Sequence, residues 1–215
     1  MSKPEYVILL HGLARSANSM NKIAERLNEE GYSVINIDYP SRDYPLEELA
    51  EKVMSDALSR SGDQRVNFVT HSMGGILVRQ YLSNHQVENL NRVVMLGPPN
   101  KGSEIVDKLS DVPSFHFING AAGTQLGTGD FSIPNKLGKA NFNVGIIAGT
   151  KSINLLLSAF IPEANDGKVS VASTKLDGMN DHIAMETTHT FMMKNKKVIE
   201  QVVLYLKTGM FQHSD

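Results

Sequence analysis

Cysteine is absent from the 215-residue sequence. Its absence excludes a disulfide framework, a thiolate metal site and a cysteine nucleophile, so folding must rest on packing. The sequence also lacks a large excess of either charge, with a formal net charge of -2 and a pI near 6.4. Because such a chain has no general positive field to attract a phosphate backbone, we expect no nucleic-acid partner.

Long apolar runs are missing as well. The longest candidate, Ile153 to Ile161, is interrupted by Asn154 and Ser158 and falls short of the roughly 20 residues that span a bilayer. We therefore expect no integral membrane segment. The stretch Met1 to Pro4 leads directly into apolar residues, without the charged start and small-residue cleavage site of a secretory signal. A cytoplasmic location is the resulting prediction.

The length and a hydrophobic content of 41% suit one compact domain with a sizeable core. We therefore predict a single domain over residues 1–215. Within it, the stretch of about 101–143 is predicted to be rich in loops and to form at most a minimal lid, because glycine and proline residues interrupt it too often for long elements. They include Gly120, Gly123, Gly127, Gly129, Pro134 and Gly138.

Apolar runs typical of buried strands alternate with segments that have helical spacing. The runs predict strands at Tyr6–Leu10, Ser33–Ile37, Arg65–Thr70, Arg92–Leu96 and Val144–Ala148. The helical patterns cover Asn18–Glu30, Leu46–Leu58, Gly74–Leu82 and Lys196–Lys207. Strands separated by helices of this length imply right-handed crossovers and a mostly parallel sheet covered on both faces. The predicted fold class is therefore a three-layer α/β sandwich with a small or absent lid.

The segment from Val66 to Ile76 is a predicted strand, a tight turn and the start of a helix, with Ser72 at the apex. A serine at such a turn is exposed for nucleophilic attack, and a small residue after Met73 lets the helix begin close to the strand. The usual pattern is G-x-S-x-G, whereas here Thr70 replaces the first glycine. The alternative interpretation is an ordinary turn in which the serine only caps the helix.

Three further segments accompany this turn. The first strand ends in His11-Gly12-Leu13, and two later motifs are Leu96 to Ser103 and Asn165 to Val171. With them, the chain resembles the bacterial lipase and esterase branch of the α/β-hydrolase family, including small proteins similar to GPI inositol-deacylase-like hydrolases. The resemblance covers nearly the whole chain. It implies an oxyanion hole formed by two backbone amides, those of Leu13 and Met73.

The same resemblance implies a triad in the order serine, acid, histidine. It places the acid at Asp166, in an Asn-Asp-Gly-x-Val setting, and the base at His189, before the last helix. The alternative interpretation is an Asn-Asp-Gly turn in which Asp166 hydrogen-bonds its own backbone, as such turns commonly do. His182 is the rival base, because a strand ending near Ser173 would also be followed by a histidine. His11 and His71 are interpreted as structural residues beside the site.

We expect no cofactor and no metal, because the candidate ligands Asp166, Asp181 and His182 lack compact spacing. The predicted reaction is the cleavage of a small-molecule carboxylic ester through an acyl-enzyme intermediate. An acyltransferase or thioesterase with the same triad, or a binding protein without catalysis, remain alternatives. The oligomeric state is not predicted. Eight apolar residues are candidates for an acyl pocket or the core, namely Phe115, Phe117, Leu126, Phe131, Ile153, Leu155, Leu156 and Phe160.

Overall fold

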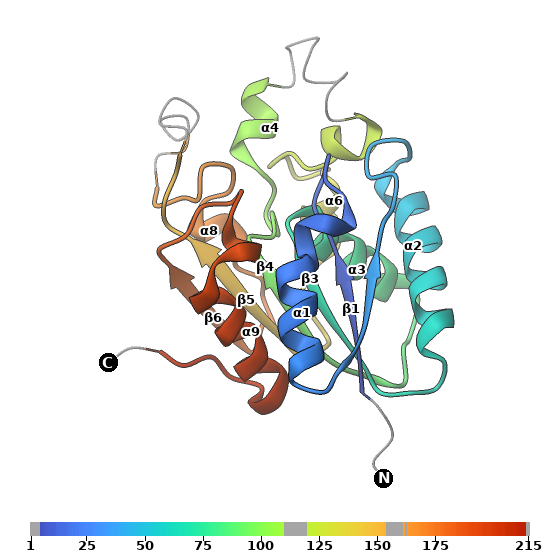
Figure 1. Cartoon of the computed structure of the whole chain (residues 1–215). Helices are drawn as coiled ribbons and strands as arrows, with labels where there is room; N and C mark the ends of the chain where they lie inside the picture. Colours follow the sequence, from blue (N-terminus) through green and yellow to red (C-terminus); the bar gives the residue numbers. More distant parts are fainter. Residues whose placement is uncertain (1–4, 110–119, 154–160, 162, 214–215) are drawn as a thin grey trace.

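Six parallel strands form one open sheet in the computed structural model, which describes residues 5–109, 120–153, 161 and 163–213 (Figure 1). The order across the sheet is β2-β1-β3-β4-β5-β6. The bounds are β1 (Tyr6–Leu10), β2 (Ser33–Ile37), β3 (Val66–His71), β4 (Leu90–Leu96), β5 (Val144–Gly149) and β6 (Asp181–Met185). Since all neighbouring pairs are parallel, the carboxyl ends of the strands meet at one edge of the sheet.

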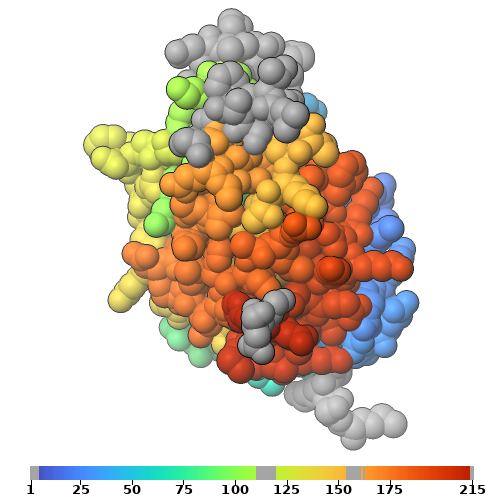
Figure 2. Space-filling model, turned by 90° about the vertical axis from the view of Figure 1, so that its left-hand side faces the viewer, coloured from blue at the N-terminus to red at the C-terminus, as the bar shows by residue number. Residues whose placement is uncertain are grey.

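Helices cover both faces of this sheet, as the alternation of side chains in β1 illustrates. Val7 and Leu9 pack in one buried cluster with residues of α1 (Asn21–Glu29) and α9 (Lys196–Thr208). Ile8 and Leu10 point the other way and pack with residues of α2 (Leu46–Ser61) and α3 (Met73–Asn84). The molecule is thus a three-layer α/β sandwich, which confirms the predicted fold class. In Figure 2 the face toward the viewer consists mainly of the orange and red C-terminal segments.

Most predicted elements occur in the structure within a few residues of their expected bounds. The helix predicted for Asn18–Glu30 divides into a 3-10 turn, Ala17–Met20, and α1. Two expectations near the C-terminus need correction. No strand ends near Ser173, because Val171–Thr174 forms the short helix α8. The last strand, β6, was not predicted at all.

The described part of the stretch 101–143 contains short helices. They are α4 (Glu104–Leu109), α6 (Ile133–Lys136) and a helical turn at 120–124. Residues 110–119 lie outside the described part of the chain, so the predicted minimal lid is described only in part. The N-terminal end of α4 lies above the carboxyl end of β4 (Figure 1), and the loops at this edge form the candidate site.

A buried arginine fastens these loops to α3. Arg79 is only 5% exposed, and its guanidinium donates hydrogen bonds to four oxygens, which lie in the loop after β4 and in the segment of α6 and the turn that follows it. Nη1 lies 3.0 Å from the Asn100 carbonyl oxygen and 3.1 Å from its Oδ1, while Nη2 reaches the carbonyl oxygens of Pro134 and Gly138 at 3.0 and 2.9 Å. Burial lowers the pKa of Arg79 to about 10, so the group stays charged at neutral pH and its donors remain available.

Candidate active site

Ser72 occupies the turn between β3 and α3 in a backbone conformation that side chains rarely adopt. Its φ is 53° and its ψ is -122°, a combination that costs free energy and is typical of functional turns. The Ser72 amide donates to the Leu96 carbonyl oxygen at 2.8 Å, which fixes the turn to β4. The hydroxyl makes no capping hydrogen bond to α3. The interpretation of Ser72 as a mere helix cap is therefore wrong.

Two glycines after the serine let α3 pack closely against the neighbouring strands. A Cβ atom at Gly74 would lie 2.8 Å from the Leu10 carbonyl oxygen, so only glycine lets α3 begin this close to β1. A Cβ atom at Gly75 would lie 3.2 Å from Oγ1 of the fully buried Thr70. The absence of a side chain at Gly75 on α3 thus leaves room for Thr70 on β3, where the usual pattern has a glycine.

A continuous hydrogen-bonded relay links Ser72, His189 and Asp166. The Ser72 Oγ atom lies 3.0 Å from Nε2 of His189, and Nδ1 of the same ring lies 2.7 Å from Oδ2 of Asp166. His189 is 4% exposed and Asp166 is 1% exposed. Because a carboxylate only accepts hydrogen bonds, the Nδ1 atom of neutral His189 carries the proton and Nε2 is free to accept one from the serine. The structure thus brings the three predicted residues together.

Asp166 also makes the backbone contacts that the alternative interpretation required. Its Oδ1 accepts hydrogen bonds from the amides of Lys168 and Val169 at 3.0 and 2.9 Å. The two interpretations are therefore compatible, since each carboxylate oxygen serves one of them. The rival base His182 lies on β6, where its Nε2 is 2.9 Å from Oγ1 of Thr174. It takes no part in the relay.

The end of β4 makes room for this relay. Gly97 has a φ of 54°, and a Cβ atom there would lie 3.0 Å from Oδ2 of Asp166 and 3.2 Å from Nδ1 of His189. A larger residue would therefore crowd the two atoms whose hydrogen bond orients the imidazole, and it would also be strained by the positive φ. The Gly97 amide donates to the Ile147 carbonyl oxygen at 2.8 Å, which ties this position to β5.

The two amides predicted to form an oxyanion hole follow β1 and Ser72. Leu13 lies in the loop after β1 and lines the cavity that contains Ser72. Met73 is the first residue of α3, where a backbone amide has no intrahelical acceptor. Within the part of the chain that the structure describes, neither amide donates a hydrogen bond to a protein atom. Both donors are therefore available to a ligand.

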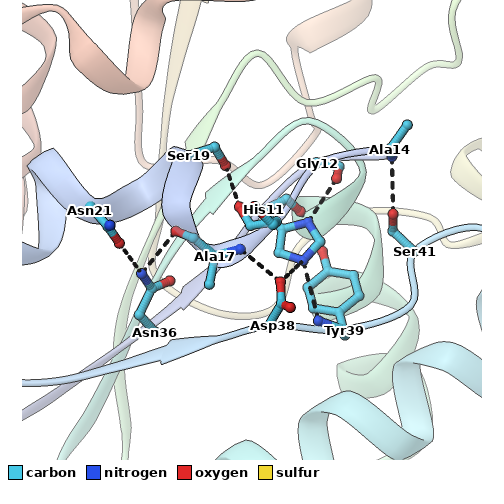
Figure 3. Close-up of polar contacts among 11 residues, drawn as sticks. His11, Gly12, Ala14, Ala17, Ser19, Asn21, Asn36, Asp38, Tyr39 and Ser41 are labelled. Atoms are coloured by element: carbon cyan, nitrogen blue, oxygen red, sulfur yellow. Dashed lines mark hydrogen bonds and ion pairs between the residues drawn. The ribbon is translucent and has the colours of Figure 1, made fainter.

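A buried aromatic pair supports the loop that carries Leu13 (Figure 3). The rings of His11 and Tyr39 stack with centroids 3.9 Å apart, and the Tyr39 hydroxyl donates to the His11 carbonyl oxygen. The His11 ring contacts the Gly12 carbonyl oxygen through Nδ1 at 2.8 Å. Farther along, the Ala14 amide donates to Oγ of Ser41 at 3.0 Å. These contacts hold the loop in place. The sequence motifs did not indicate them.

A cavity of about 80 Å³ opens beside Ser72 and His189. Its apolar lining consists of Leu13, Pro99, Ile105, Val106, Leu126 and Val169. Leu126 was among the predicted pocket residues, whereas Phe131 and Ile153 are 87% and 63% exposed. The other five candidates lie outside the described residues. Two basic residues that sequence reasoning missed, Arg15 and Lys168, also line the cavity, and each stands two positions after a predicted site residue.

His71 lies beneath the relay and holds the backbone of His189. The ring is 1% exposed, and its Nε2 is 2.9 Å from the His189 carbonyl oxygen. A carbonyl can only accept, so Nε2 of His71 carries the proton. Burial, and then the positive charges that His189 and Arg15 can carry, hold the pKa of His71 well below its ordinary value. His71 is therefore a neutral donor in the folded protein.

This burial predicts a loss of stability in mild acid. The unfolded chain takes up protons on His71 near pH 6.5, whereas the folded protein does not, so the free energy of unfolding falls as the pH drops below about 6.5. The expected slope is up to roughly 1.4 kcal/mol per pH unit for each such histidine. Urea unfolding at several pH values between 7.5 and 5 would measure it, and His71→Gln should flatten the slope. The exposed His85 offers the control, His85→Gln, and equal slopes in both variants would contradict the prediction.

Within the described residues, no three histidine, aspartate or glutamate side chains gather in a way that could hold a metal ion. A search of the same residues for a helix long and apolar enough to cross a bilayer finds none.

Comparison with known proteins identifies the family. The family model described as alpha/beta hydrolase fold matches residues 5–119, more than half of the chain. No curated protein sequence matches. Among solved structures, the mature lipase BlEst2 of Bacillus licheniformis has a TM-score of 0.73 at 21% identity, over 97% of this chain and 95% of its own.

Two further structures have the same fold. The esterase EaEST of Exiguobacterium antarcticum gives a TM-score of 0.62 at 20% identity, over 97% of this chain and 94% of its own. A bromoperoxidase of Bacillus anthracis gives 0.67 at 19% identity, over 95% and 92%. At these identities the structural likeness establishes the fold, not the reaction. Together with the family match, the sheet order and the Ser72 turn, it assigns the chain to the alpha/beta hydrolase fold family.

Proposed function

We propose that this protein is a serine hydrolase that cleaves carboxylic esters through an acyl-enzyme intermediate. The observation that carries the proposal is the relay from Ser72 Oγ to His189 Nε2, 3.0 Å, and from His189 Nδ1 to Asp166 Oδ2, 2.7 Å. These are the distances at which a base takes a hydroxyl proton and a carboxylate stabilises the resulting imidazolium.

In the acylation step, the Ser72 oxygen forms a bond to the ester carbonyl carbon while His189 takes the hydroxyl proton. The carbonyl electron pair moves onto oxygen, where the amides of Leu13 and Met73 stabilise the negative charge. When the tetrahedral intermediate collapses, the bond to the alcohol oxygen breaks and His189 returns the proton to that oxygen. The alcohol leaves, and the acyl group stays on Ser72.

In the deacylation step, water takes the place of the alcohol. His189 removes a proton from water as the water oxygen attacks the acyl carbon, and the same two amides again face the oxyanion. The proton then passes to the Ser72 oxygen as the acid is released. Each step leaves His189 neutral again, and the two steps together restore the Ser72 hydroxyl, so the cycle needs no cofactor.

The size of the cavity favours a short acyl group. Apolar cavities near 150 Å³ hold a benzene molecule, and the cavity beside Ser72 is about half as large, near 80 Å³. It therefore suits roughly two to four carbon atoms. The narrower resemblance to GPI inositol-deacylase-like hydrolases stays a hypothesis, because it rests on sequence motifs alone.

A fluorophosphonate probe followed by peptide mass analysis tests the proposal. Because the probe phosphonylates activated serines, we expect one adduct, on the peptide that contains Ser72, and none after the protein is unfolded in urea. In parallel, p-nitrophenyl esters of two, four and ten carbons should be cleaved with kcat/KM falling toward the longest chain. An adduct on another serine, or no adduct and no ester cleavage, would refute the proposed nucleophile.

The same acyl enzyme can serve an acyltransferase or thioesterase. Product analysis separates these from an esterase, because a transferase forms a new ester when a second alcohol is added, and a thioesterase cleaves a thioester faster than the matching ester. A non-catalytic binding protein would give neither the adduct nor turnover.

A further inference from the structure

Two positively charged side chains line the cavity that contains Ser72. Arg15 follows the Leu13 amide by two residues, and Lys168 follows Asp166 by two residues. They come from loops far apart in the sequence, after β1 and after β5, and meet at the same cavity. The rest of its lining is largely apolar, so this pair supplies its fixed positive charge.

Within the described residues, neither side chain of this pair forms an ion pair or a hydrogen bond. Lys168 is exposed, as Lys151 and Arg60 are, but the latter two pair with the carboxylates of Glu186 and Asp56. Two carboxylates from neighbouring segments bind other groups. Asp166 is held by His189 and by two amides. Oε1 of Glu104, at the start of α4, accepts from two serine hydroxyls, while its Oε2 is buried without a hydrogen-bond partner in the described residues.

The main chain beneath both cations is fixed. The Lys168 amide donates to Asp166 Oδ1 at 3.0 Å, and the Lys168 carbonyl oxygen accepts from Ser103 Oγ at 2.9 Å. Arg15 directly follows Ala14, whose amide is bonded to Ser41 and whose φ of 54° marks a constrained turn (Figure 3). The charges can therefore move only as far as their own side chains reach.

The charges of Arg15 and Lys168 affect each other and also the pKa of a histidine beside the cavity. Desolvation of the ammonium group and then the charge of Arg15 lower the pKa of Lys168, while the Asp166 carboxylate acts in the opposite direction. Both cations also contribute to the lowered pKa of His71, after the larger effects of burial and His189. The two like charges thus repel each other, and the Asp166 carboxylate, which is bound to His189, offsets this repulsion only in part, so an anionic ligand would relieve it further.

We propose that the substrate is an ester with an anionic group, a carboxylate or a phosphate, which is held between Arg15 and Lys168 while the ester carbonyl lies at Ser72. This inference rests on the proposed function. A guanidinium offers a planar fork of donors that suits either anion, and an ammonium adds a compact charge beside it. Negative charge is thus recognised near the reacting carbonyl, but by residues outside the relay.

Matched substrates test this directly. The protein would be assayed with 4-acetoxybenzoate and its neutral methyl ester, with 4-acetoxyphenyl phosphate and its dimethyl ester, and with mono-4-nitrophenyl adipate against 4-nitrophenyl hexanoate. Each rate is divided by the rate of alkaline hydrolysis of the same ester, which removes differences in leaving group. We expect at least one anionic member to exceed its neutral partner about 10-fold or more in kcat/KM, as for a charge-assisted hydrogen bond. The pairs show whether carboxylate or phosphate is preferred, and on which side of the ester.

Variants then assign the preference to the two cations. Arg15→Gln, Lys168→Gln and the double variant should lower the ratio of anionic to neutral kcat/KM, and the double variant should bring it near one. The control is Lys22→Gln combined with Arg60→Gln, which removes the same charge from exposed positions of α1 and α2. Its ratio should equal that of the unmodified protein. Added salt should lower the ratio in the unmodified protein by screening.

The anionic-substrate proposal can be wrong while the hydrolase proposal is right, and the experiments distinguish the two cases. Equal kcat/KM for all anionic and neutral partners, or a preference that survives in the double variant, would overturn the anionic substrate while neutral esters are still cleaved. If Ser72 reacts with no probe and no ester of either kind is cleaved, the hydrolase proposal itself fails.

Discussion

Replacing Ser72 with alanine should abolish ester cleavage, with a fall in kcat of about 10⁴- to 10⁶-fold. The reason is that, in the proposed mechanism, the relay to His189 and Asp166 activates one particular hydroxyl, and the remaining donors act only on the oxyanion. Steady-state assays with p-nitrophenyl acetate would measure the loss. Ser72→Gly should be equally inactive but about 1 kcal/mol more stable to urea, because glycine relieves the positive φ of 53°.

The matched control is Ser83→Ala. This exposed serine lies on α3, the helix that Ser72 precedes, and its hydroxyl only contacts the carbonyl oxygen of Gln80. It should retain the activity of the unmodified protein. Turnover by Ser72→Ala within 10-fold of the unmodified protein would show that Ser72 is not the nucleophile.

Replacing Asp166 with asparagine should lower kcat by about 10⁴-fold while preserving the fold. The amide oxygen can keep the two hydrogen bonds from Lys168 and Val169, which bind Oδ1. The amide nitrogen would then occupy the position of Oδ2, 2.7 Å from Nδ1 of His189. Two donors cannot face each other, so the imidazole proton would move to Nε2 and the ring could no longer accept the Ser72 proton.

The asparagine variant is compared with Asp181→Asn. That carboxylate also binds a histidine, His213, but on β6 and outside the relay. We expect it to retain activity. Circular dichroism and urea midpoints should show that Asp166→Asn remains folded, and kcat/KM should fall through kcat. Activity in the asparagine variant close to that of the unmodified protein would contradict the assigned role of the acid.

The fold was predictable where burial imposes a simple pattern. Strands such as Tyr6–Leu10 and Val144–Gly149 are buried along nearly their whole length, so their sequences are continuous apolar runs. The edge strand β6 escaped prediction because it lacks this property. It begins with Asp181 and His182, is only half-buried for most of its length, and takes its strand conformation from pairing with β5.

The site was predictable in its motifs but not in its distances. A serine turn and two loops at the carboxyl ends of parallel strands indicate which side chains converge, because the sheet brings those ends to one edge. The 3.0 Å distance from Nε2 of His189 to Oγ of Ser72 depends on loop conformation, which the sequence pattern does not reveal. So does the meeting of Arg15 and Lys168 at one cavity, since no periodic pattern encodes the path of a loop.

The hydrogen bonds that Arg79 donates affect how this protein can evolve. Three of its four acceptors are main-chain oxygens, of Asn100, Pro134 and Gly138, and only one is a side chain. A main-chain oxygen is present whatever residue occupies the position. Most side chains in these segments can therefore be replaced during evolution without loss of the Arg79 hydrogen bonds. New substrate preferences can then arise while Ser72, His189 and Asp166 keep their relative positions.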